Sequence, residues 1–123
     1  MKLTTNFRKS EFDSKDGAEM PAEVLTNINK LAANLQVLRD RLGVPIRVNS
    51  GYRSPSHNAA VKGARFSQHL LGTAADIAVS GYTTKKVAEV IEELIKSGLM
   101  KEGGLKAYNT FVHYDIRGVR ARW

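Results

Sequence analysis

The stretch Ser67-Gln-His-Leu-Leu-Gly-Thr-Ala-Ala-Asp76 places a histidine and an aspartate seven positions apart, with Gly72 between them. In a helix, that spacing would put His69 and Asp76 on one face. Gly72 and the small residues beside it favour a loop that turns sharply into a strand, because glycine adopts backbone angles that other residues avoid. We therefore expect His69 on a loop and Asp76 on a buried strand over residues 74–79, where two alanines allow close packing.

Two longer stretches have the spacing of amphipathic helices. From Pro21 to about Leu42, apolar residues recur at three- and four-residue steps, and Gly43 follows as a stop signal. Residues 83–97 repeat this periodicity and are followed by a glycine. A shorter helical segment of one or two turns is expected over residues 54–61. The apolar faces of the two long helices are predicted to form the core.

Short strands are expected around these helices. Residues 46–48 alternate like a strand, and three further strands are predicted at roughly 105–108, 111–116 and 119–122. Residues 1–20 are polar and rich in turn-forming residues, and we expect them to form an arm anchored on the body by Phe7 and Phe12. Helices separated from short, turn-linked strands predict an α+β fold.

The composition describes an ordinary globular protein with an excess of positive charge. At 123 residues the chain is most simply one domain, 1–123, and its hydrophobic share of 42% and charged share of 25% are typical. The net charge of +7 favours anionic partners such as nucleic acid, membrane surfaces or bacterial wall polymers. The opening residues lack the apolar segment of a signal peptide, and no apolar run approaches the roughly 18 residues that span a bilayer.

His69, Asp76 and a distant His113 form a candidate metal site. The chain has no cysteine, so a metal would have to be held by histidine, aspartate or glutamate. Two imidazoles and one carboxylate suit zinc and leave a fourth position open for water, as in catalytic sites. Spacing alone is weak evidence for a metal and better fits a loop histidine, a turn or capping aspartate and a core histidine. Because His113 and Asp115 share one face of a strand, Asp115 would lie near such a metal, either as a general base or as a hydrogen-bond partner of the ligands.

The segment from Ser67 to Asp76 resembles a known family signature. Its serine, histidine, glycine, alanine and aspartate reproduce the Ser-x-His-x-x-Gly-x-Ala-x-Asp pattern of the D-alanyl-D-alanine zinc peptidases. That family includes D-Ala-D-Ala carboxypeptidases, vancomycin-resistance-type dipeptidases and phage L-alanyl-D-glutamate endolysins, and it shares a fold with the hedgehog proteins. The resemblance covers about residues 20–123 and extends to four flanking segments: 50–55, 58–61, 111–118 and 120–123.

The resemblance implies a fold and a set of roles. The fold would be a small antiparallel sheet with two main helices. One zinc ion per chain would be held by His69, Asp76 and His113, with water in the fourth position. Arg53 would contact a substrate carboxylate or steady charge on the scissile carbonyl, although on its own it is an ordinary turn arginine. Further contacts with substrate are expected from two residues: Ser67, which could instead cap its loop, and Tyr52.

The chain departs from better-known family members at the general base. Those members usually carry a glutamate or aspartate a few residues before the last histidine, whereas residues 106–110 contain no carboxylate. Asp115 is the acid that we predict as general base, and Glu102 is the second choice. If neither acts, the domain would bind metal and substrate without turnover. His57 lies outside the signature and is expected at the surface or the groove edge, and Tyr108 and Tyr114 could line the groove.

Three functions follow in order of preference. The first is a monomeric zinc peptidase that cuts peptidoglycan at bonds involving D-amino acids, made in the cytoplasm and acting on the cell wall as a phage or prophage lysis enzyme or virion component. The second is a non-catalytic zinc- or wall-binding module, or a phage structural protein. The third, a nucleic-acid binder, rests only on the net charge and on Arg117, Arg120 and Arg122. We expect no nucleic-acid binding, because no recognition-helix pattern or aromatic stacking motif accompanies these arginines.

Overall fold

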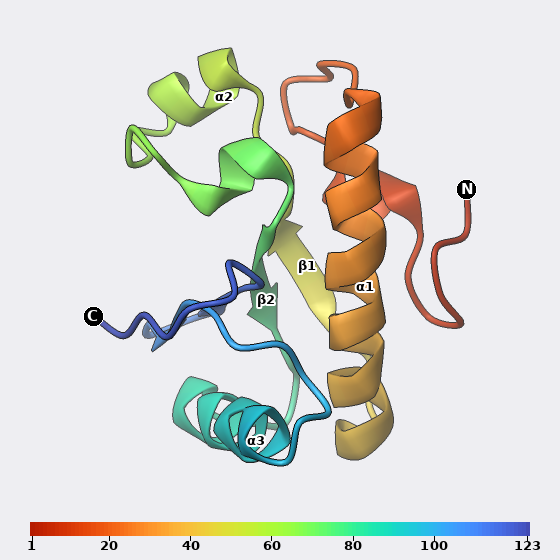
Figure 1. The fold of residues 1–123 in the computed structure, drawn as a ribbon, viewed down its shortest axis with the longest axis vertical. Coiled ribbons are helices and arrows are strands. Elements are labelled where there is room, and N and C mark those ends of the chain that lie inside the picture. Colours follow the sequence, from red (N-terminus) through yellow and green to blue (C-terminus); the bar gives the residue numbers. More distant parts are fainter.

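The two long helices of the computed structural model, which describes residues 1–123, are those that the periodicity predicts. α1 (Ala22–Leu42) follows Pro21 and ends at Gly43, whose φ of 71° is left-handed. α3 (Thr84–Lys96) follows Thr83, whose hydroxyl accepts a hydrogen bond from a backbone N–H of the first turn. α1 runs alongside the strands and α3 lies across one end of the molecule (Figure 1), where α3 packs on β3 and β4 and touches α1.

Four antiparallel strands form one sheet in the order β1-β2-β4-β3. Their bounds are β1 (Arg47–Ser50), β2 (Ala74–Ala78), β3 (Leu105–Ala107) and β4 (Val112–Asp115). Asp76 of β2 lies directly opposite His113 of β4. Side chains alternate along both strands, so Ile77 and Tyr114 enter the hydrophobic core while Asp76 and His113 lie on the other face. The α+β fold with a small antiparallel sheet is therefore confirmed.

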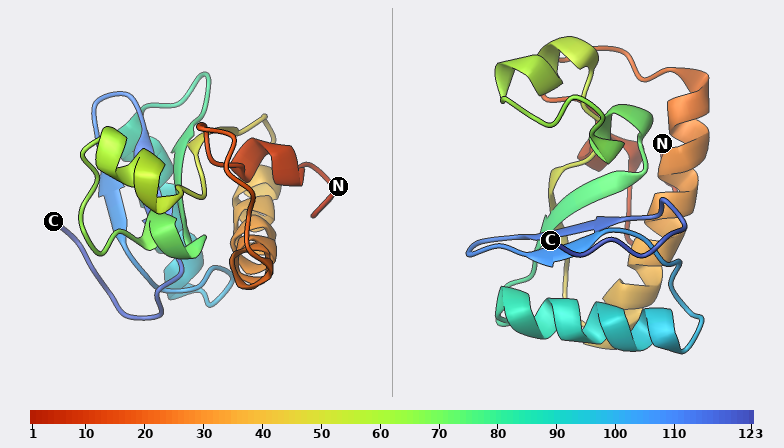
Figure 2. Two further views of the ribbon diagram at one scale, coloured as in Figure 1. Left: turned by 90° about the horizontal axis from the view of Figure 1, so that it is seen from above. Right: turned by 60° about the vertical axis from the view of Figure 1, so that its left-hand side comes forward.

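The loop between β1 and β2 contains two short helical segments. α2 (Pro55–Ala60) is the short helix expected over residues 54–61, and the hydroxyl of Ser54 caps it. η2 (Gln68–Leu71) is a 3₁₀ turn, so His69 lies on a helical turn rather than on an open loop. Both segments lie on the side of the sheet away from α3, and η2 leads directly into β2 (Figure 2).

The N-terminal arm packs on the body of the protein. It contains one 3₁₀ turn, η1 (Lys9–Phe12), and its two phenylalanines, Phe7 and Phe12, are buried in the core. The carbonyl of Phe12 accepts a 2.8 Å hydrogen bond from the backbone N–H of Tyr52. The arm therefore supports the segment that follows β1, which carries residues of the site described below.

The prediction of a strand over residues 119–122 is wrong. Only Ala121 pairs there, through a single parallel bridge to Gly104. The two arginines of this segment, Arg120 and Arg122, reach Glu92 on α3 instead, at 3.3 Å and 2.8 Å. Side-chain ion pairs, rather than a backbone ladder, hold this last segment. No helix of the protein combines the length and apolar character needed to cross a bilayer.

Candidate metal centre

Two local features place His69 beside Asp76. The hydroxyl of Ser67 accepts the backbone N–H of His69 at 3.1 Å and caps η2. Gly72 ends η2 with a φ of 75° and lies against α1, where an added Cβ would be 2.6 Å from Val24 Cγ1. The chain can therefore turn from η2 into β2 within a few residues only because glycine occupies position 72.

The structure brings the three predicted metal ligands together. Ligand atoms of His69, Asp76 and His113 all lie within 4.8 Å of one another, and all three residues are buried. Asp76 Oδ1 is 3.2 Å from His69 Nε2 and 3.3 Å from His113 Nδ1. Ligands placed 2.0–2.1 Å from a tetrahedral zinc ion lie about 3.3 Å apart, so these separations fit such an ion.

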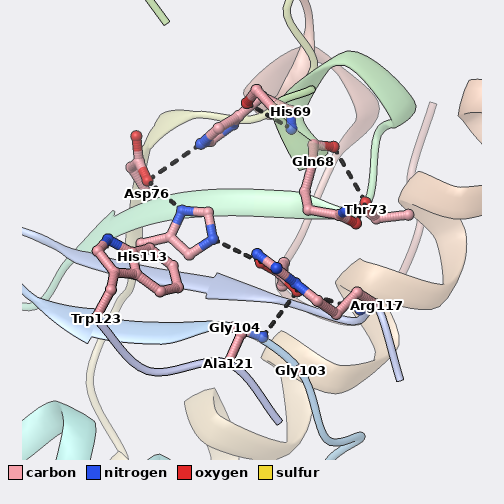
Figure 3. Close-up of polar contacts among 12 residues, drawn as sticks. Gln68, His69, Thr73, Asp76, Gly103, Gly104, His113, Arg117, Ala121 and Trp123 are labelled. Carbon is pink, nitrogen blue, oxygen red and sulfur yellow. Dashed lines mark hydrogen bonds and ion pairs between the residues drawn. The ribbon is translucent and has the colours of Figure 1, made fainter. Parts of the chain in front are cut away.

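The hydrogen bonds fix which ring nitrogens are free (Figure 3). His69 Nδ1 lies 2.7 Å from the carbonyl of Gly51, which can only accept, so Nδ1 carries the proton and Nε2 is left with its lone pair. His113 Nε2 lies 2.7 Å from Asp115 Oδ2, so Nδ1 is the free nitrogen of that ring. Both free nitrogens face Asp76. The other nitrogen of each ring is hydrogen-bonded to an oxygen, as is usual for metal-bound histidines.

The centre is suited to a cation. Two nitrogen lone pairs cannot face one carboxylate oxygen at this distance unless a proton or a metal lies between them. In the absence of metal, burial alone would raise the pKa of Asp76, but hydrogen bonds and charge from His113 and His69 outweigh it and hold that pKa far below its usual range. Burial disfavours protonation of His113, yet the carboxylates of Asp115 and Asp76 raise its pKa. Two imidazole nitrogens and one carboxylate oxygen form a donor set that fits zinc.

Arg53 holds the second oxygen of Asp76. Its guanidinium donates to Asp76 Oδ2 at 3.2 Å, to Ser50 Oγ at 3.2 Å and to Asn58 Oδ1 at 3.3 Å. Its backbone N–H donates to the carbonyl of His69. Arg53 therefore leaves Asp76 Oδ1 free to act as a single-oxygen ligand, and its side chain also lines the groove beside the metal centre.

Asp115 is placed differently from what a general base requires. It is fully buried, and its two oxygens accept hydrogen bonds from His113 Nε2, the backbone N–H of Gly104 and the guanidinium of Arg117. Burial alone would raise its pKa, but these donors outweigh burial and hold the pKa far below its usual range. A carboxylate with no free lone pair facing the groove matches the other role considered for it, that of a partner orienting His113.

The residues that hold Asp115 were not predicted in this role from the sequence. Arg117 donates from Nε at 2.9 Å and from a terminal nitrogen at 2.7 Å, a bidentate pair. A side chain at Gly103 or Gly104 would overlap Asp115, so both positions need glycine for close approach. The Gly-Gly pair and the Asp-x-Arg spacing are visible in the sequence, but their relation across the sheet is not.

The metal centre lies in a groove of about 510 Å³. The three ligands and Arg53, which are buried or largely so, form its floor. Arg117 and four aromatic side chains also line it: Phe66, Tyr108, Phe111 and Trp123. Asp76 is the one carboxylate among the lining residues. Glu102, the second choice for general base, is held by Arg120 and Arg122 and does not line the groove.

The remaining predicted residues divide between groove and core. Ser67 lines the groove as well as capping η2. Tyr52, expected to contact substrate, is 5% exposed and belongs to the hydrophobic core instead. Tyr114 is also buried and donates its hydroxyl to the carbonyl of Lys101. His57 lies on α2 and does not line the groove.

The arginines behind the nucleic-acid hypothesis are paired. Arg117 is bound to Asp115, while Arg120 and Arg122 share the carboxylates of Glu92 and Glu102. Neutralised side chains offer little attraction to a phosphate backbone, whose binding depends on free cations. This cluster therefore does not support nucleic-acid binding.

Comparison with known proteins agrees with the geometry. No curated protein matches the chain. A sequence model of the family described as Peptidase M15 matches residues 2–115, which include all three candidate metal ligands. Members of this family are zinc-dependent peptidases. With a match over most of its length and a buried His-Asp-His group, the chain belongs to the peptidase M15 family, the D-Ala-D-Ala zinc peptidases.

Proposed function

We propose that this chain is a zinc-dependent peptidase that hydrolyses peptide bonds of bacterial peptidoglycan at D-amino-acid positions. The observation that carries the proposal is the convergence of His69 Nε2, His113 Nδ1 and Asp76 Oδ1 in a member of the peptidase M15 family. Each ligand is held by a further hydrogen bond, to Gly51, Asp115 or Arg53. A site preorganised in this way suits catalysis better than a chance cluster of polar residues.

The chain's own residues would divide the work. Zinc, when bound, polarises a peptide carbonyl and lowers the pKa of a water molecule towards roughly 7. Arg53, fixed by Ser50 and Asn58, offers its remaining N–H groups to a substrate carboxylate or to the charge that develops on the carbonyl oxygen. Asp115 and Arg117 would hold His113 in orientation without touching substrate.

Charge supports a carboxylate-rich substrate. The protein carries a net charge of +7, and Arg53 lines the groove with N–H groups that its contacts to Ser50, Asn58 and Asp76 leave free. Stem peptides of peptidoglycan contain several carboxylates, so this electrostatic field would favour their approach. The setting that we propose is a monomeric phage or prophage lysis enzyme, or a virion component, acting on the cell wall. Both carboxypeptidase and endopeptidase cleavage are compatible with an open groove.

One observation favours a second candidate, a zinc- and wall-binding module without turnover. Proton transfer in peptide hydrolysis needs an acceptor near the attacking water. The groove offers one carboxylate, Asp76, which is itself a metal ligand whose second oxygen is bound to Arg53. Asp115 and Glu102 are both occupied elsewhere. A domain of this kind would retain metal and wall peptide but release no product.

The test combines metal analysis with digestion of purified sacculi. We expect about one zinc per chain in the wild type and the release of new amino groups from sacculi. His69→Ala and His113→Ala should lose both properties. His57→Ala is the matched control, because it removes the third histidine, which lies outside the groove. Folded His69→Ala and His113→Ala proteins that retain zinc would contradict the metal site.

The same preparation separates the alternatives. Zinc-loaded protein that stays on sacculi without releasing amino groups would establish the binding module. If the protein neither binds nor digests sacculi but retards duplex DNA in a gel in a strongly salt-dependent manner, the nucleic-acid hypothesis would be supported instead. Mass analysis of released fragments would identify the bond that is cut.

A further inference from the structure

We infer that Tyr108 donates a hydrogen bond from its phenol to an acceptor oxygen of the peptide bound in the groove, and that the indole of Trp123 aims this phenol. The inference rests on the proposed peptidase function and adds a substrate contact to it. Tyr108 and Trp123 both line the groove that contains the metal centre.

Trp123 connects the metal centre to Tyr108. Its ring lies edge-on to the ring of His113, with centroids 5.1 Å apart and an interplanar angle of 67°. Figure 3 shows it beside His113, and the guanidinium carbon of Arg117 lies 5.8 Å from its ring centroid. Its Nε1–H donates to the phenol oxygen of Tyr108 at 3.0 Å. The phenol is thus separated from a metal ligand by a single side chain.

Tyr108 itself is held in place on several sides. Its ring stacks on Phe111, with centroids 4.6 Å apart and planes inclined by 16°. Lys106 Nζ lies 5.2 Å from the ring centroid, a cation–π contact. The backbone N–H of Tyr108 donates to the carbonyl of Phe111, and its own carbonyl accepts the hydroxyl of Thr84 at 2.6 Å. Both the ring and its backbone are therefore positioned before any ligand binds.

The direction of the hydrogen bonds makes Tyr108 a donor towards the groove. An indole N–H can only donate, so the phenol oxygen accepts from Trp123 and its own proton must point elsewhere. No protein acceptor takes that proton, and Tyr108 is among the residues that line the groove. A peptide offers the acceptors that the groove lacks, namely backbone carbonyls and carboxylates. The phenol therefore complements Arg53, which supplies donors from the floor of the groove.

The test compares Tyr108→Phe with wild-type protein on a soluble stem pentapeptide, L-Ala-D-Glu-diamino acid-D-Ala-D-Ala, which contains every stem bond. The variant retains the ring that stacks on Phe111 and removes only the hydroxyl. We expect kcat/KM to fall roughly 3- to 10-fold if the acceptor is a carbonyl, and further if it is a carboxylate. Zinc content and the thermal midpoint should not change. Tyr82→Phe is the control, because that phenol donates to the carbonyl of Leu42, away from the groove.

A second variant tests the aiming role of Trp123. Trp123→Phe retains an aromatic ring beside His113 and removes the indole N–H. It should lower kcat/KM in the wild-type background but have little further effect when combined with Tyr108→Phe, since the two act through one contact. Equal, additive losses would overturn the aiming role. Because Trp123 is the chain's single tryptophan, its emission also reports occupancy of the groove, and calorimetry gives the dissociation constant for variants that lack it.

The outcomes separate this inference from the function on which it rests. Wild-type kinetics in Tyr108→Phe, with the pentapeptide still cleaved by the wild type, would overturn the Tyr108 contact alone. If the wild type binds the pentapeptide without cutting it, the same 3- to 10-fold effect is expected on the dissociation constant. Wild-type protein that neither binds nor cleaves the pentapeptide would overturn the Tyr108 contact with a stem peptide, whereas the digestion of sacculi decides the proposed function independently.

Discussion

Asp115 illustrates how its neighbours decide what a carboxylate can do. As a bare residue two positions after a metal ligand, it has the chemistry of a general base. Its oxygens are instead saturated by His113, Gly104 and Arg117, and no part of it is exposed. Arg117 thereby fixes the carboxylate, and the carboxylate fixes the ring of His113. The pair resembles the outer-shell partners that orient histidine ligands in many zinc sites.

Asp115→Asn should therefore weaken zinc binding. The amide cannot accept from His113, Gly104 and Arg117 together, so His113 loses its fixed orientation, and we expect about 10- to 100-fold lower zinc affinity. Competition with a chromophoric chelator measures this. Asp13→Asn, which removes a half-buried carboxylate paired with Lys9 on the N-terminal arm, controls for the loss of one negative charge. Unchanged zinc affinity with abolished hydrolysis would return Asp115 to the role of general base.

At the scale of elements, the turn from η2 to β2 matters more than either element alone. Gly72 and Gly43 both end helical segments in the left-handed conformation, with φ of 75° and 71°. A Cβ at Gly43 would meet nothing within 4 Å, whereas at Gly72 it would press on the side chain and backbone of Val24 in α1. Replacing Gly43 by alanine therefore tests the cost of the left-handed backbone conformation alone, whereas replacing Gly72 adds the cost of a steric clash.

Gly43→Ala and Gly72→Ala form a matched pair. The left-handed conformation should cost each variant about 1–2 kcal/mol of unfolding free energy. Gly72→Ala should lose about 1–3 kcal/mol more through the clash with Val24, and its zinc affinity should fall because η2 carries His69. Denaturant unfolding and the chelator assay measure the two effects. Equal zinc affinity in both variants would show that the metal centre tolerates movement of η2.

Periodicity predicted the helices well and the last segment poorly. In α1, buried residues such as Leu31, Leu35 and Leu38 follow the helical repeat because one face packs on the core. Residues 119–122 alternate apolar and charged residues as a strand would, yet the same pattern arises here because Arg120 and Arg122 bind Glu92. The spacing of neighbouring residues does not reveal ion pairs with a distant helix. The sequence alone therefore could not exclude a strand over residues 119–122.

At the scale of the whole molecule, the site combines local motifs with contacts that only the fold creates. His69, Asp76 and His113 could be chosen from the sequence because the family signature contains the first two and the resemblance of residues 111–118 to the family's last segment supplies the third. The role of Asp115 could not, since the backbone N–H that Gly104 donates to it comes from the segment just before β3, which is distant in sequence. Tyr52 was misplaced for a similar reason: the arm covers it, and its backbone bonds to Phe12.

The arm also reaches the base of α2, through Asp16. Its carboxylate accepts the hydroxyl of Ser54, the N-cap of α2, at 2.6 Å, together with the hydroxyl of Ser14 at 2.7 Å and the backbone N–H of Ala18 at 3.1 Å. These hydrogen bonds, with the one from Ser54 foremost, lower the pKa of Asp16 from 3.8 to about 2. The arm and the helix beside the groove are therefore joined by a charge-dependent contact.

This contact gives the protein a predictable response to acid. The pKa of Asp16 is lower in the folded state than the value of 3.8 that the group has when unfolded. The ionised carboxylate therefore stabilises the fold fully above pH 3.8, and this stabilisation is lost as the pH falls towards 2. Asp16→Asn should therefore lower the urea midpoint at pH 7, and its difference from wild type should shrink as the pH falls through this window. Unfolding curves at a series of pH values measure this, with Asp13→Asn as the control for charge. If the difference in urea midpoint between Asp16→Asn and wild type stays constant down to the lowest pH, the lost stability comes from a missing contact rather than from the ionised carboxylate.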